Sequence, residues 1–485
     1  MNVAVDPARA IAAAQEILRR RDVRRRGERL HGFMSEFWHV LEPGVEFKTG
    51  WAIEAMCEHL EAVTSGEIKR LIINVPPGMS KSLTTAVFWP AWEWTFAPQT
   101  RVLSAAYASH LSERDSQKFG RLVTSPAYKT VYGDVFKTTK ATITDVENDH
   151  FGFRKAMAFK SLTGSRGNRV IIDDPLSVDQ AKSATELRNA ADTFTEAVPS
   201  RLNDPEKDAI VMIMQRLHED DPSGLALQHN LGYEHLMLPM EFEPERRCHT
   251  SIGFTDPRTY DGELLFPERF TAEVVARDKH VMSSVNGSYA VAGQYQQRPA
   301  PRGGGMFKRE WFKFLPTAPR LIRVVRGWDF AATDDPSAAR TAAVRMGQDS
   351  EGRFVIDSVI KDRLSPAGVE KLLLSVAQTD GRLVKGDIPK DPGQAGKMQI
   401  EHWIRMLAGF TYTASPETGS KETRAEPLAA QCEVGNVYLV EGEWNAEFVD
   451  ELCMFPAGKF KDQVDAASRA FLALTTKSRS MLQSM

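Results

Sequence analysis

The stretch RLIINVPPGMSKS, from Arg70 to Ser82, decides the fold of the first part of the chain. Its apolar start predicts a buried strand, the prolines and Gly78 predict a loop, and a helix is expected from about Ser82. The loop matches only part of the phosphate-binding pattern G-x-x-x-x-G-K-[ST], because Val75 and Ser80 occupy the glycine positions. Taken alone, it is as typical of an ordinary strand–helix turn as of a nucleotide site.

A phosphate-binding loop holds its ligand with backbone N–H groups in front of a helix N-terminus. Pro76 and Pro77 have no N–H, so the cradle would begin at Gly78, whose flexibility could offset that lost at Ser80. In such a loop the lysine meets the outer phosphates and the following hydroxyl ligates Mg²⁺. The residues expected to contact the nucleotide are Pro77, Gly78, Met79, Ser80, Lys81 and Ser82.

A second motif, VIIDDP, ends an apolar strand in two adjacent carboxylates, Asp173 and Asp174. A nucleotide hydrolase needs one acid at a strand end to hold hydrated Mg²⁺ and another to orient the attacking water. Asp173 fits the first role and Asp174 the second, where a glutamate is commoner. Together with the loop, the pair favours nucleotide hydrolysis over an Asp-Asp-Pro turn that merely ends a strand.

Two more polar residues are candidates for the same chemistry. Arg166 lies between glycines in SLTGSRGNR, and a mobile arginine can neutralise charge that develops on a phosphate. Gln215, in IMQRLHEDD, follows the next apolar strand, where a sensor of the outer phosphate would lie. A surface loop position for Arg166 and a strand-end position for Gln215 stay open as alternatives.

The alternation of strand, loop and helix predicts a parallel α/β sheet, with further strands at 101–107, 169–174 and 208–216. After QQRPAPRGGGMF the pattern restarts, and two strands joined by QDSEG predict a mixed sheet that opens with a hairpin meander. The fold class is therefore α/β, with a parallel-sheet domain that carries the P-loop candidate followed by a mixed-sheet domain. We expect a helical arm at 1–45, the P-loop domain at 46–245, a linker at 246–318 and the second domain at 319–478.

The last third of the chain contains an ordered set of aspartates. Nucleases of the ribonuclease H type gather carboxylates at one end of a sheet to hold two metal ions, for which Mg²⁺ or Mn²⁺ is suited. Asp329 lies on the first strand of the meander, and Asp391 follows a later strand in KDPGQAGK, with Asp387 as the alternative second acid. Asp462 and Asp465 would share one helical face, although Asp462 could also be an ordinary helix N-cap.

Composition and charge narrow the class of protein further. The chain has 485 residues, 42% hydrophobic and 26% charged, with a net charge of −3, which does not exclude a local basic channel for nucleic acid. No apolar run is long enough to span a bilayer and no secretory signal is visible, so a cytoplasmic location is expected. The four cysteines lack metal-ligand spacing and are expected to be buried free thiols. The arginine-rich run at 19–29 could be a solvated arm or a contact with DNA or another subunit.

These residues together resemble the large terminase subunits of tailed bacteriophages and prophages. The segments that carry the resemblance are RLIINVPPGMSKS, RVIIDDPLSVDQAKS, MQRLHEDDPSG, QYQQRPAPRGGGMF, DPGQAGK and FKDQVDAASRAF. They occur in the family's order and cover about residues 45 to 475.

The resemblance implies a P-loop (ASCE) parallel-sheet ATPase domain followed by an RNase-H-like mixed-sheet nuclease domain. The ATPase would use ATP and Mg²⁺ to pump double-stranded DNA into a procapsid, and the endonuclease would cut concatemers. It implies that Lys81 and Ser82 bind phosphate and Mg²⁺, that Asp173 is the Walker B acid, and that Gln215 lies in the coupling motif. Asp174 stands where the catalytic carboxylate belongs, and Arg166 looks like the arginine that acts across a subunit interface. The nuclease residues implied are Asp329, Asp391 and Asp462, with Asp465 as an auxiliary metal ligand.

The family also implies a setting. Its members assemble as a ring, usually of five subunits, on the portal protein, and they work with a small terminase subunit. The implied location is the cytoplasm of the infected host, with transient docking on the procapsid and absence from the mature virion.

One departure from the family concerns the phosphate loop. Relatives often read P-P-R-H-G-K-S, whereas Gly78, Met79 and Ser80 stand here in place of Arg-His-Gly. Because this loop lacks the arginine, an arginine that acts on the nucleotide of its own subunit is in doubt. Slow hydrolysis of ATP is then one of the alternatives. The alternatives are a recombination or helicase-like nuclease, which would need a second motor domain, a transposase or integrase, which the ATPase half disfavours, and an inactive prophage remnant.

Overall fold

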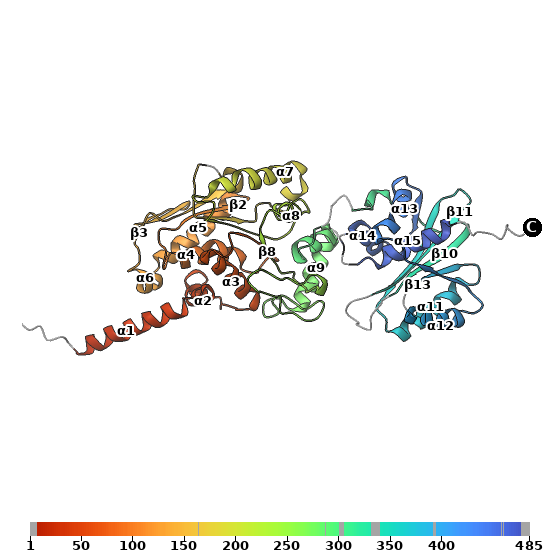
Figure 1. Cartoon of the computed structure of the whole chain (residues 1–485), viewed down its shortest axis with the longest axis horizontal. Helices are drawn as coiled ribbons and strands as arrows, with labels where there is room; N and C mark the ends of the chain where they lie inside the picture. Colours follow the sequence, from red (N-terminus) through yellow and green to blue (C-terminus); the bar gives the residue numbers. More distant parts are fainter. Residues whose placement is uncertain are drawn as a thin grey trace, which may run out of the picture. The chain divides into compact units, whose positions relative to one another are not determined.

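The computed structural model describes residues 7–162, 164–286, 288–299, 305–330, 340–390, 394–456, 458 and 460–476. The chain forms two compact units (Figure 1). The first comprises residues 1–286 and 290–299, and the second 287–289 and 300–485. The short helix α10 (Ser288–Ala290) lies where the chain passes between them, inside the stretch 246–318 that was expected to be a linker.

The first unit contains an eight-stranded sheet in the order β3-β4-β5-β2-β6-β7-β1-β8. The strands from β5 to β8 in this order are parallel, and β3 and β4 extend the edge as antiparallel strands. The strand β7 lies between β1 and β6, the strands that lead into the phosphate-loop motif and the paired aspartates. The strands are β1 (Arg70–Asn74), β2 (Arg101–Ala106), β3 (Thr138–Ala141), β4 (Asp145–Asn148), β5 (Phe153–Ala158), β6 (Arg169–Asp173), β7 (Ala209–Met214) and β8 (Glu234–Met237).

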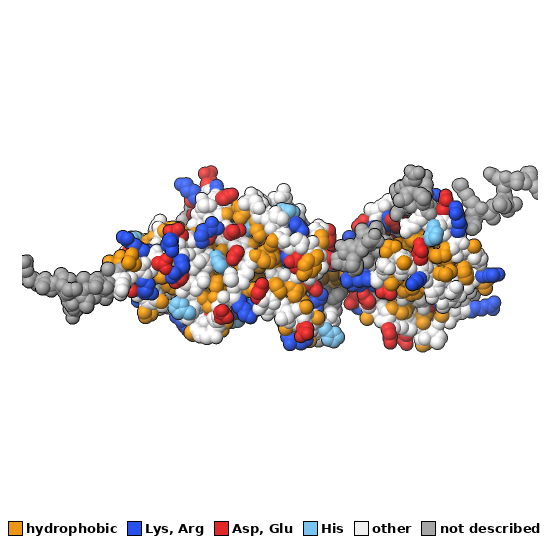
Figure 2. Space-filling model, turned by 90° about the horizontal axis from the view of Figure 1, so that it is seen from below, with side chains coloured by type: hydrophobic (Ala, Val, Ile, Leu, Met, Phe, Trp, Pro, Cys, Tyr) orange, Lys and Arg blue, Asp and Glu red, His pale blue; other side chains and the backbone are white. Residues whose placement is uncertain are grey.

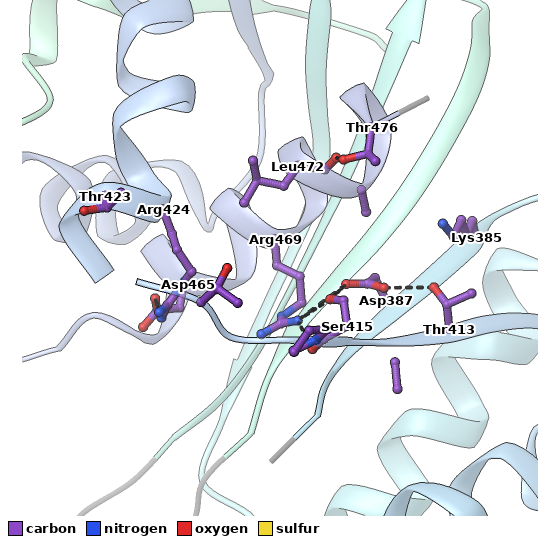
Figure 3. A pocket seen from close by; sticks show the side chains of 14 residues that line it. Lys385, Asp387, Thr413, Ser415, Thr423, Arg424, Asp465, Arg469, Leu472 and Thr476 are labelled. Atoms are coloured by element: carbon purple, nitrogen blue, oxygen red, sulfur yellow. Dashed lines mark hydrogen bonds and ion pairs between the residues drawn. The ribbon is translucent and has the colours of Figure 1, made fainter. Parts of the chain in front are cut away.

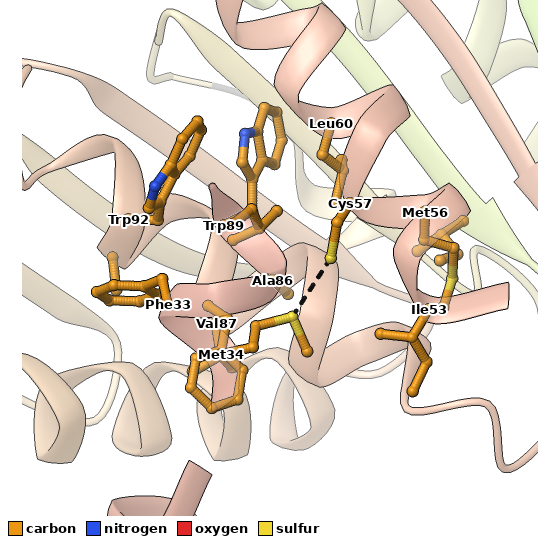
Figure 4. Close-up of a cluster of buried hydrophobic side chains, with 14 of the residues drawn as sticks. Phe33, Met34, Ile53, Met56, Cys57, Leu60, Ala86, Val87, Trp89 and Trp92 are labelled. Atoms are coloured by element: carbon orange, nitrogen blue, oxygen red, sulfur yellow. Dashed lines mark hydrogen bonds between the residues drawn. The ribbon is translucent and has the colours of Figure 1, made fainter. Parts of the chain in front are cut away.

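Both faces of this sheet are covered, which explains why its central strands are apolar throughout. On β1, Leu71 and Ile73 join the larger core, whereas Ile72 joins the core on the opposite face. Figure 4 shows part of the larger core, where the thiol of Cys57 lies 3.6 Å from the sulfur of Met34. The helices of the unit are α1 (Pro7–Arg26), α2 (Leu30–Leu41), α3 (Trp51–Ser65), α4 (Trp89–Glu93), α5 (Ser109–Thr124), α6 (Pro126–Tyr132), α7 (Ala184–Asp192), α8 (Pro222–Gln228) and α9 (Ala272–Asn286).

The helix expected after the loop begins as a π-helix at Leu83–Phe88 and continues as α4. Pro90 has no N–H to donate to the carbonyl of Ala86, four residues earlier. The buried guanidinium of Arg154 donates to this carbonyl instead, with an Nε–O distance of 3.1 Å. Arg154 therefore ties β5 to the helix that carries the phosphate loop.

The second unit contains a seven-stranded mixed sheet in the order β14-β13-β10-β11-β12-β15-β9. The predicted meander is confirmed, because β10, β11 and β12 pair antiparallel while β13 pairs parallel to β10. The strands are β9 (Lys313–Leu315), β10 (Leu321–Asp329), β11 (Thr341–Asp349), β12 (Phe354–Asp362), β13 (Lys385–Lys390), β14 (Thr411–Pro416) and β15 (Val437–Val440). The predicted fold class, a P-loop sheet followed by an RNase-H-like sheet, is thus confirmed.

Helices also cover both faces of the second sheet (Figure 1). Along β11, Ala342 and Val344 face the core formed with α13 to α15, and Ala343 faces the core formed with α11 and α12. The helices are α11 (Pro366–Asp380), α12 (Gln394–Met406), α13 (Lys421–Glu433), α14 (Asn445–Met454) and α15 (Asp462–Thr475).

The surface and the cysteines agree with the expectations from composition. On the face drawn in Figure 2, basic and acidic side chains are interspersed. All four cysteines are buried and free. In the part of the chain that the structure describes, no helix is long and apolar enough to cross a membrane.

Candidate functional site

The candidate residues of the first unit lie at one edge of its sheet. The strands β1, β6 and β7 are parallel neighbours, so their carboxyl ends meet at the same edge. The phosphate-loop motif follows β1, Asp173 ends β6, and Gln215 follows β7. Three segments that are far apart in the sequence therefore converge where ligands bind in open α/β sheets.

The loop between β1 and the π-helix takes two left-handed residues. Gly78 has a φ of 83° and Ser80 a φ of 56°. Ser80 thus adopts at the usual glycine position the conformation for which glycine is normally needed. The N–H groups of Gly78 and Ser80 donate to no other residue that the structure describes, which leaves both able to bind a phosphate oxygen.

The ammonium of Lys81 lies against the second of the paired aspartates. Its Nζ is 2.6 Å from Oδ1 of Asp174, and the side chain of Lys81 is buried. The same carboxylate oxygen accepts a hydrogen bond from the backbone N–H of Gln215 at 3.3 Å. Asp174 has a φ of 44°, a left-handed conformation that aspartate tolerates better than most residues. The candidate water-orienting acid therefore touches both the lysine and the strand that carries the coupling residue.

Asp173 is buried behind the loop. Burial and the neighbouring Asp174 raise the pKa of its carboxyl, against the lowering effects of Lys81 and of a hydrogen bond from Ser82. Its Oδ1 has no hydrogen-bond partner among the described residues. A buried carboxylate with a free oxygen beside a serine hydroxyl fits the oxygen ligand set that Mg²⁺ prefers, so Asp173 and Ser82 would hold the ion.

Arg166 does not lie at this edge. It precedes β6, and Asn168 donates its backbone N–H to the carbonyl of Arg101 at the start of β2. At about 3.3 Å per residue, Arg166 is roughly 20 Å from Asp173 along the strand. Its side chain is exposed and forms no ion pair with another residue that the structure describes. Arg166 therefore cannot reach the phosphate loop of its own subunit in this conformation.

The residue that follows Gln215 is structural. Arg216 is buried and its Nε lies 2.9 Å from Oδ1 of Asp221, which caps the N-terminus of α8 through Gly224. Its guanidinium therefore holds the β7–α8 connection.

The acids of the second unit gather where α15 crosses β10. Asp329 ends β10, and Asp462 and Asp465 lie in the first turn of α15. Gly327 permits the close approach, because a Cβ at this position would lie 2.3 Å from the carbonyl oxygen of Ala466. The N-cap of α15 is Lys461, so Asp462 is not the N-cap that its sequence position also allowed.

Burial and repulsion from neighbouring carboxylates raise the pKa of Asp329 and of Asp462. Burial and the carboxylate of Asp465 raise the pKa of Asp329 well above its ordinary value. Burial and the carboxylate of Glu451 raise the pKa of Asp462 to about 6. Lys421 forms an ion pair with Asp465 and lowers the pKa of both other acids. The ammonium of Lys421 therefore offsets part of the negative charge of the three carboxylates.

The alternative second acid, Asp387, is engaged in a separate network (Figure 3). Its carboxylate accepts hydrogen bonds from Thr413 at 2.8 Å and from Ser415, and Arg469 lies 3.5 Å away. These residues line a pocket of about 520 Å³ between β13, β14, α13 and α15, which Asp465 also lines. Because three side chains hold Asp387, it is less available as a metal ligand than its sequence position suggested.

The favoured second acid, Asp391, lies outside the described residues. Among the residues that are described, no group of three or more histidine, cysteine, aspartate or glutamate side chains has a metal-binding arrangement. Asp329 and Asp462 nevertheless fit Mg²⁺ or Mn²⁺ by the chemistry of their donors, since both are carboxylates in a concentrated negative field.

Residues 326–474 match the family model described as the terminase RNaseH-like domain. This part of the chain is similar to the RNase H-like domain of terminases. The match confirms the resemblance to large terminase subunits. It covers β10 to α15 and includes Asp329, Asp387, Asp391, Asp462 and Asp465.

Solved structures similar to the chain include three from bacteriophages. The HK97 large terminase has 12% identity over 92% of this chain and 99% of its own, with a TM-score of 0.38. The large terminase of thermophilic phage D6E has 9% identity over 85% and 95%, with a TM-score of 0.32. The nuclease of the large terminase of thermophilic phage G20c, solved with bound magnesium, has 17% identity over 35% and 98%, with a TM-score of 0.27. No curated protein matches the chain.

The structure adds residues that the sequence did not single out. Arg269 and Phe270 contact the phosphate loop although about 190 residues separate them from it in sequence. Lys421 lies among the candidate acids of the second unit together with Arg424, whose Nη2 is 2.9 Å from Oδ1 of Asp465. These contacts depend on tertiary packing, and no local pattern indicates them.

Proposed function

We propose that this protein is the large subunit of a terminase, a motor that hydrolyses ATP to move double-stranded DNA into a procapsid and cuts the DNA with a two-metal endonuclease. The observation that carries the proposal is the convergence of the phosphate loop, Asp173, Asp174 and Gln215 at one sheet edge. It occurs in the same chain as a terminase RNase H-like domain.

In the ATPase site, the free N–H groups of Gly78 and Ser80 bind phosphate oxygens. Lys81 leaves Asp174 to meet the outer phosphates, which frees the Asp174 carboxylate to orient the attacking water. Asp173 and Ser82 hold Mg²⁺, which neutralises charge on the phosphates when it is bound. Because Gln215 touches Asp174 through its backbone, a shift of Asp174 on hydrolysis reaches β7 and the connection after it.

In the nuclease site, Asp329 and Asp462 would hold the metal ions, with Asp391 as the second acid and Asp465 as an auxiliary ligand. The metal ions, when bound, activate water and stabilise the leaving oxygen. Lys421 and Arg424 then exchange their contact with Asp465 for the phosphates of the DNA backbone, a contact that positions the duplex without reading its sequence.

The setting follows from the same family assignment. We propose that the chain works as a ring, of five subunits by family likeness, with the portal protein, a small terminase subunit and double-stranded DNA as partners. It would act in the host cytoplasm and at the procapsid portal. Arg166 would serve the site of a neighbouring subunit, since it precedes β6 and the phosphate loop lies at the opposite, carboxyl end of the parallel strands.

Hydrolysis of ATP in the presence and absence of double-stranded DNA tests the motor assignment. We expect DNA to stimulate hydrolysis by the wild type, and Lys81→Ala to reduce the rate roughly 100-fold or more, because it removes a preorganised charge at the transferring phosphate. Lys182→Ala is the matched control, because Lys182 is an exposed lysine of the same unit. Equal rates in Lys81→Ala and wild type would contradict the assignment.

A further inference from the structure

A short turn at 266–270 lies over the phosphate loop of the first unit. Nη1 of Arg269 is 3.2 Å from Oγ of Ser80. The ring of Phe270 lies against Gly78, since a Cβ on that glycine would be 2.7 Å from Cζ of Phe270. The guanidinium of Arg269 in turn lies 5.5 Å from the centre of the Phe270 ring. The turn therefore contacts both left-handed residues of the loop.

Contacts with other parts of the first unit hold the backbone of this turn in place. Phe266 is buried, and the backbone N–H groups of Arg269 and Phe270 both donate to its carbonyl, at 3.1 Å and 2.9 Å. Its ring fills the space at Gly50, where a Cβ would lie 2.9 Å from Cε2. Lys48 donates to the carbonyl of Glu268 at 2.9 Å. Arg269 thus projects from an anchored backbone rather than from a free loop.

The charge balance at the loop is unusual. Residues 75–82 contain no arginine, and their single lysine is paired with Asp174. The guanidinium of Arg269, by contrast, forms no ion pair with a carboxylate among the residues that the structure describes, and its one hydrogen-bond partner there is a neutral hydroxyl. An exposed guanidinium beside free backbone N–H groups is suited to binding a phosphate through two N–H donors.

We propose that Arg269 binds the phosphate chain of the nucleotide held by the loop of its own subunit, and that Phe270 positions it. The proposal rests on the proposed ATPase site and deepens it. Arg269 supplies in cis, from a distant part of the chain, the positive charge that the loop itself lacks. Gly78 is then required twice, for its backbone conformation and for the space that the Phe270 ring occupies.

Equilibrium binding of ADP and of the slowly hydrolysed analogue ATPγS, each with Mg²⁺, tests the proposal by calorimetry on the full chain. A lost charge-assisted hydrogen bond weakens binding by about 10-fold or more. We expect this loss in Arg269→Ala and, to a similar extent, in Arg269→Gln, which keeps a donor for Ser80 but removes the charge. Arg269→Lys should bind with intermediate affinity.

Arg277→Ala is the matched control, because Arg277 is an exposed arginine of the same unit that pairs with the adjacent Asp278. It should bind both nucleotides like the wild type. Wild-type affinity in Arg269→Ala or in Arg269→Gln would overturn the proposal for Arg269 while leaving the ATPase site intact. If the wild type itself binds neither nucleotide, the ATPase assignment fails, and this outcome differs from every result expected for Arg269.

Discussion

Ser80 and Gly78 show how a loop without the usual glycines keeps the phosphate-binding conformation. Both residues have positive φ values, 56° and 83°. The left-handed conformation costs a non-glycine residue roughly 1–2 kcal/mol, and Ser80 bears this cost while its hydroxyl meets Arg269. The unusual serine is therefore compatible with a working cradle.

This geometry predicts that two substitutions in the loop change the free energy of unfolding by different amounts. Gly78→Ala should lower the free energy of unfolding of the first unit by roughly 1–2 kcal/mol, because the alanine would be left-handed and would displace Phe270. Ser80→Gly should change it by less than about 1 kcal/mol, since relief of the left-handed cost opposes the added freedom of the unfolded chain. Urea unfolding followed by tryptophan fluorescence measures both. A larger loss in Ser80→Gly than in Gly78→Ala would contradict the loop geometry.

Among single residues, Asp173, Asp174 and Gln215 lie at the same sheet edge as the phosphate loop because each ends or follows an apolar strand. Strand ends of parallel neighbours meet, so Asp173 and Gln215 could be placed beside the loop without knowing any contact. The contacts of Arg269 and Lys421 could not be predicted, because they depend on how distant turns and helices pack. The ion pair between Lys81 and Asp174 likewise depends on side-chain geometry.

At the scale of elements, the central packing contact of the second unit joins α15 to β10. Gly327 brings the helix close to the strand, and the acids of both elements therefore share one small volume. The sequence indicated the meander by periodicity and placed Asp462 and Asp465 on one helical face, but it did not show that this helix would cross β10. It also did not predict the π-helix after the phosphate loop, since the proline effect at Pro90 depends on Arg154 from another strand.

The raised pKa of Asp462 predicts how the stability of this unit depends on pH. Its folded-state pKa is about 6, above the ordinary value of about 3.9, so the folded state keeps the proton longer than the unfolded state. The contribution is fully present below about pH 4 and is lost as the pH rises through 6. The melting temperature of metal-free protein should therefore fall over this range.

Asp462→Asn should flatten that fall, and the raised pKa of Asp329 leaves part of the slope in place. Differential scanning calorimetry in the presence of a chelator measures the effect between pH 4 and 7. If the melting temperature falls with pH equally steeply in the variant and the wild type, Asp462 does not titrate in the way its burial implies.

At the scale of the whole molecule, each of the two compact units has its own sheet and its own cores. The fold class could be predicted from the restart of the strand pattern after residue 307. The border between the units was harder to predict, because the stretch from 246 to 286 is rich in turns yet packs into the first unit. Its residues 266–270 contact the phosphate loop.

The position of Arg166 predicts cooperation between subunits. We expect Arg166→Ala and Lys81→Ala each to be inactive in ATP hydrolysis when assembled alone. Rings mixed from the two variants should regain part of the activity, because some interfaces then combine an intact Arg166 with an intact Lys81. The measurement is DNA-stimulated hydrolysis at fixed total protein. No recovery in mixed, assembled rings would argue against a role in trans.

The central claim is that one chain carries an ATPase site in its first unit and a metal-dependent nuclease site in its second. The most direct test measures ATP hydrolysis and Mn²⁺-dependent plasmid cleavage in the same preparations of wild type, Lys81→Ala and Asp329→Ala. We predict that Lys81→Ala loses hydrolysis and keeps cleavage, whereas Asp329→Ala loses cleavage and keeps hydrolysis. Hydrolysis retained in Lys81→Ala, or cleavage retained in Asp329→Ala, would contradict the claim.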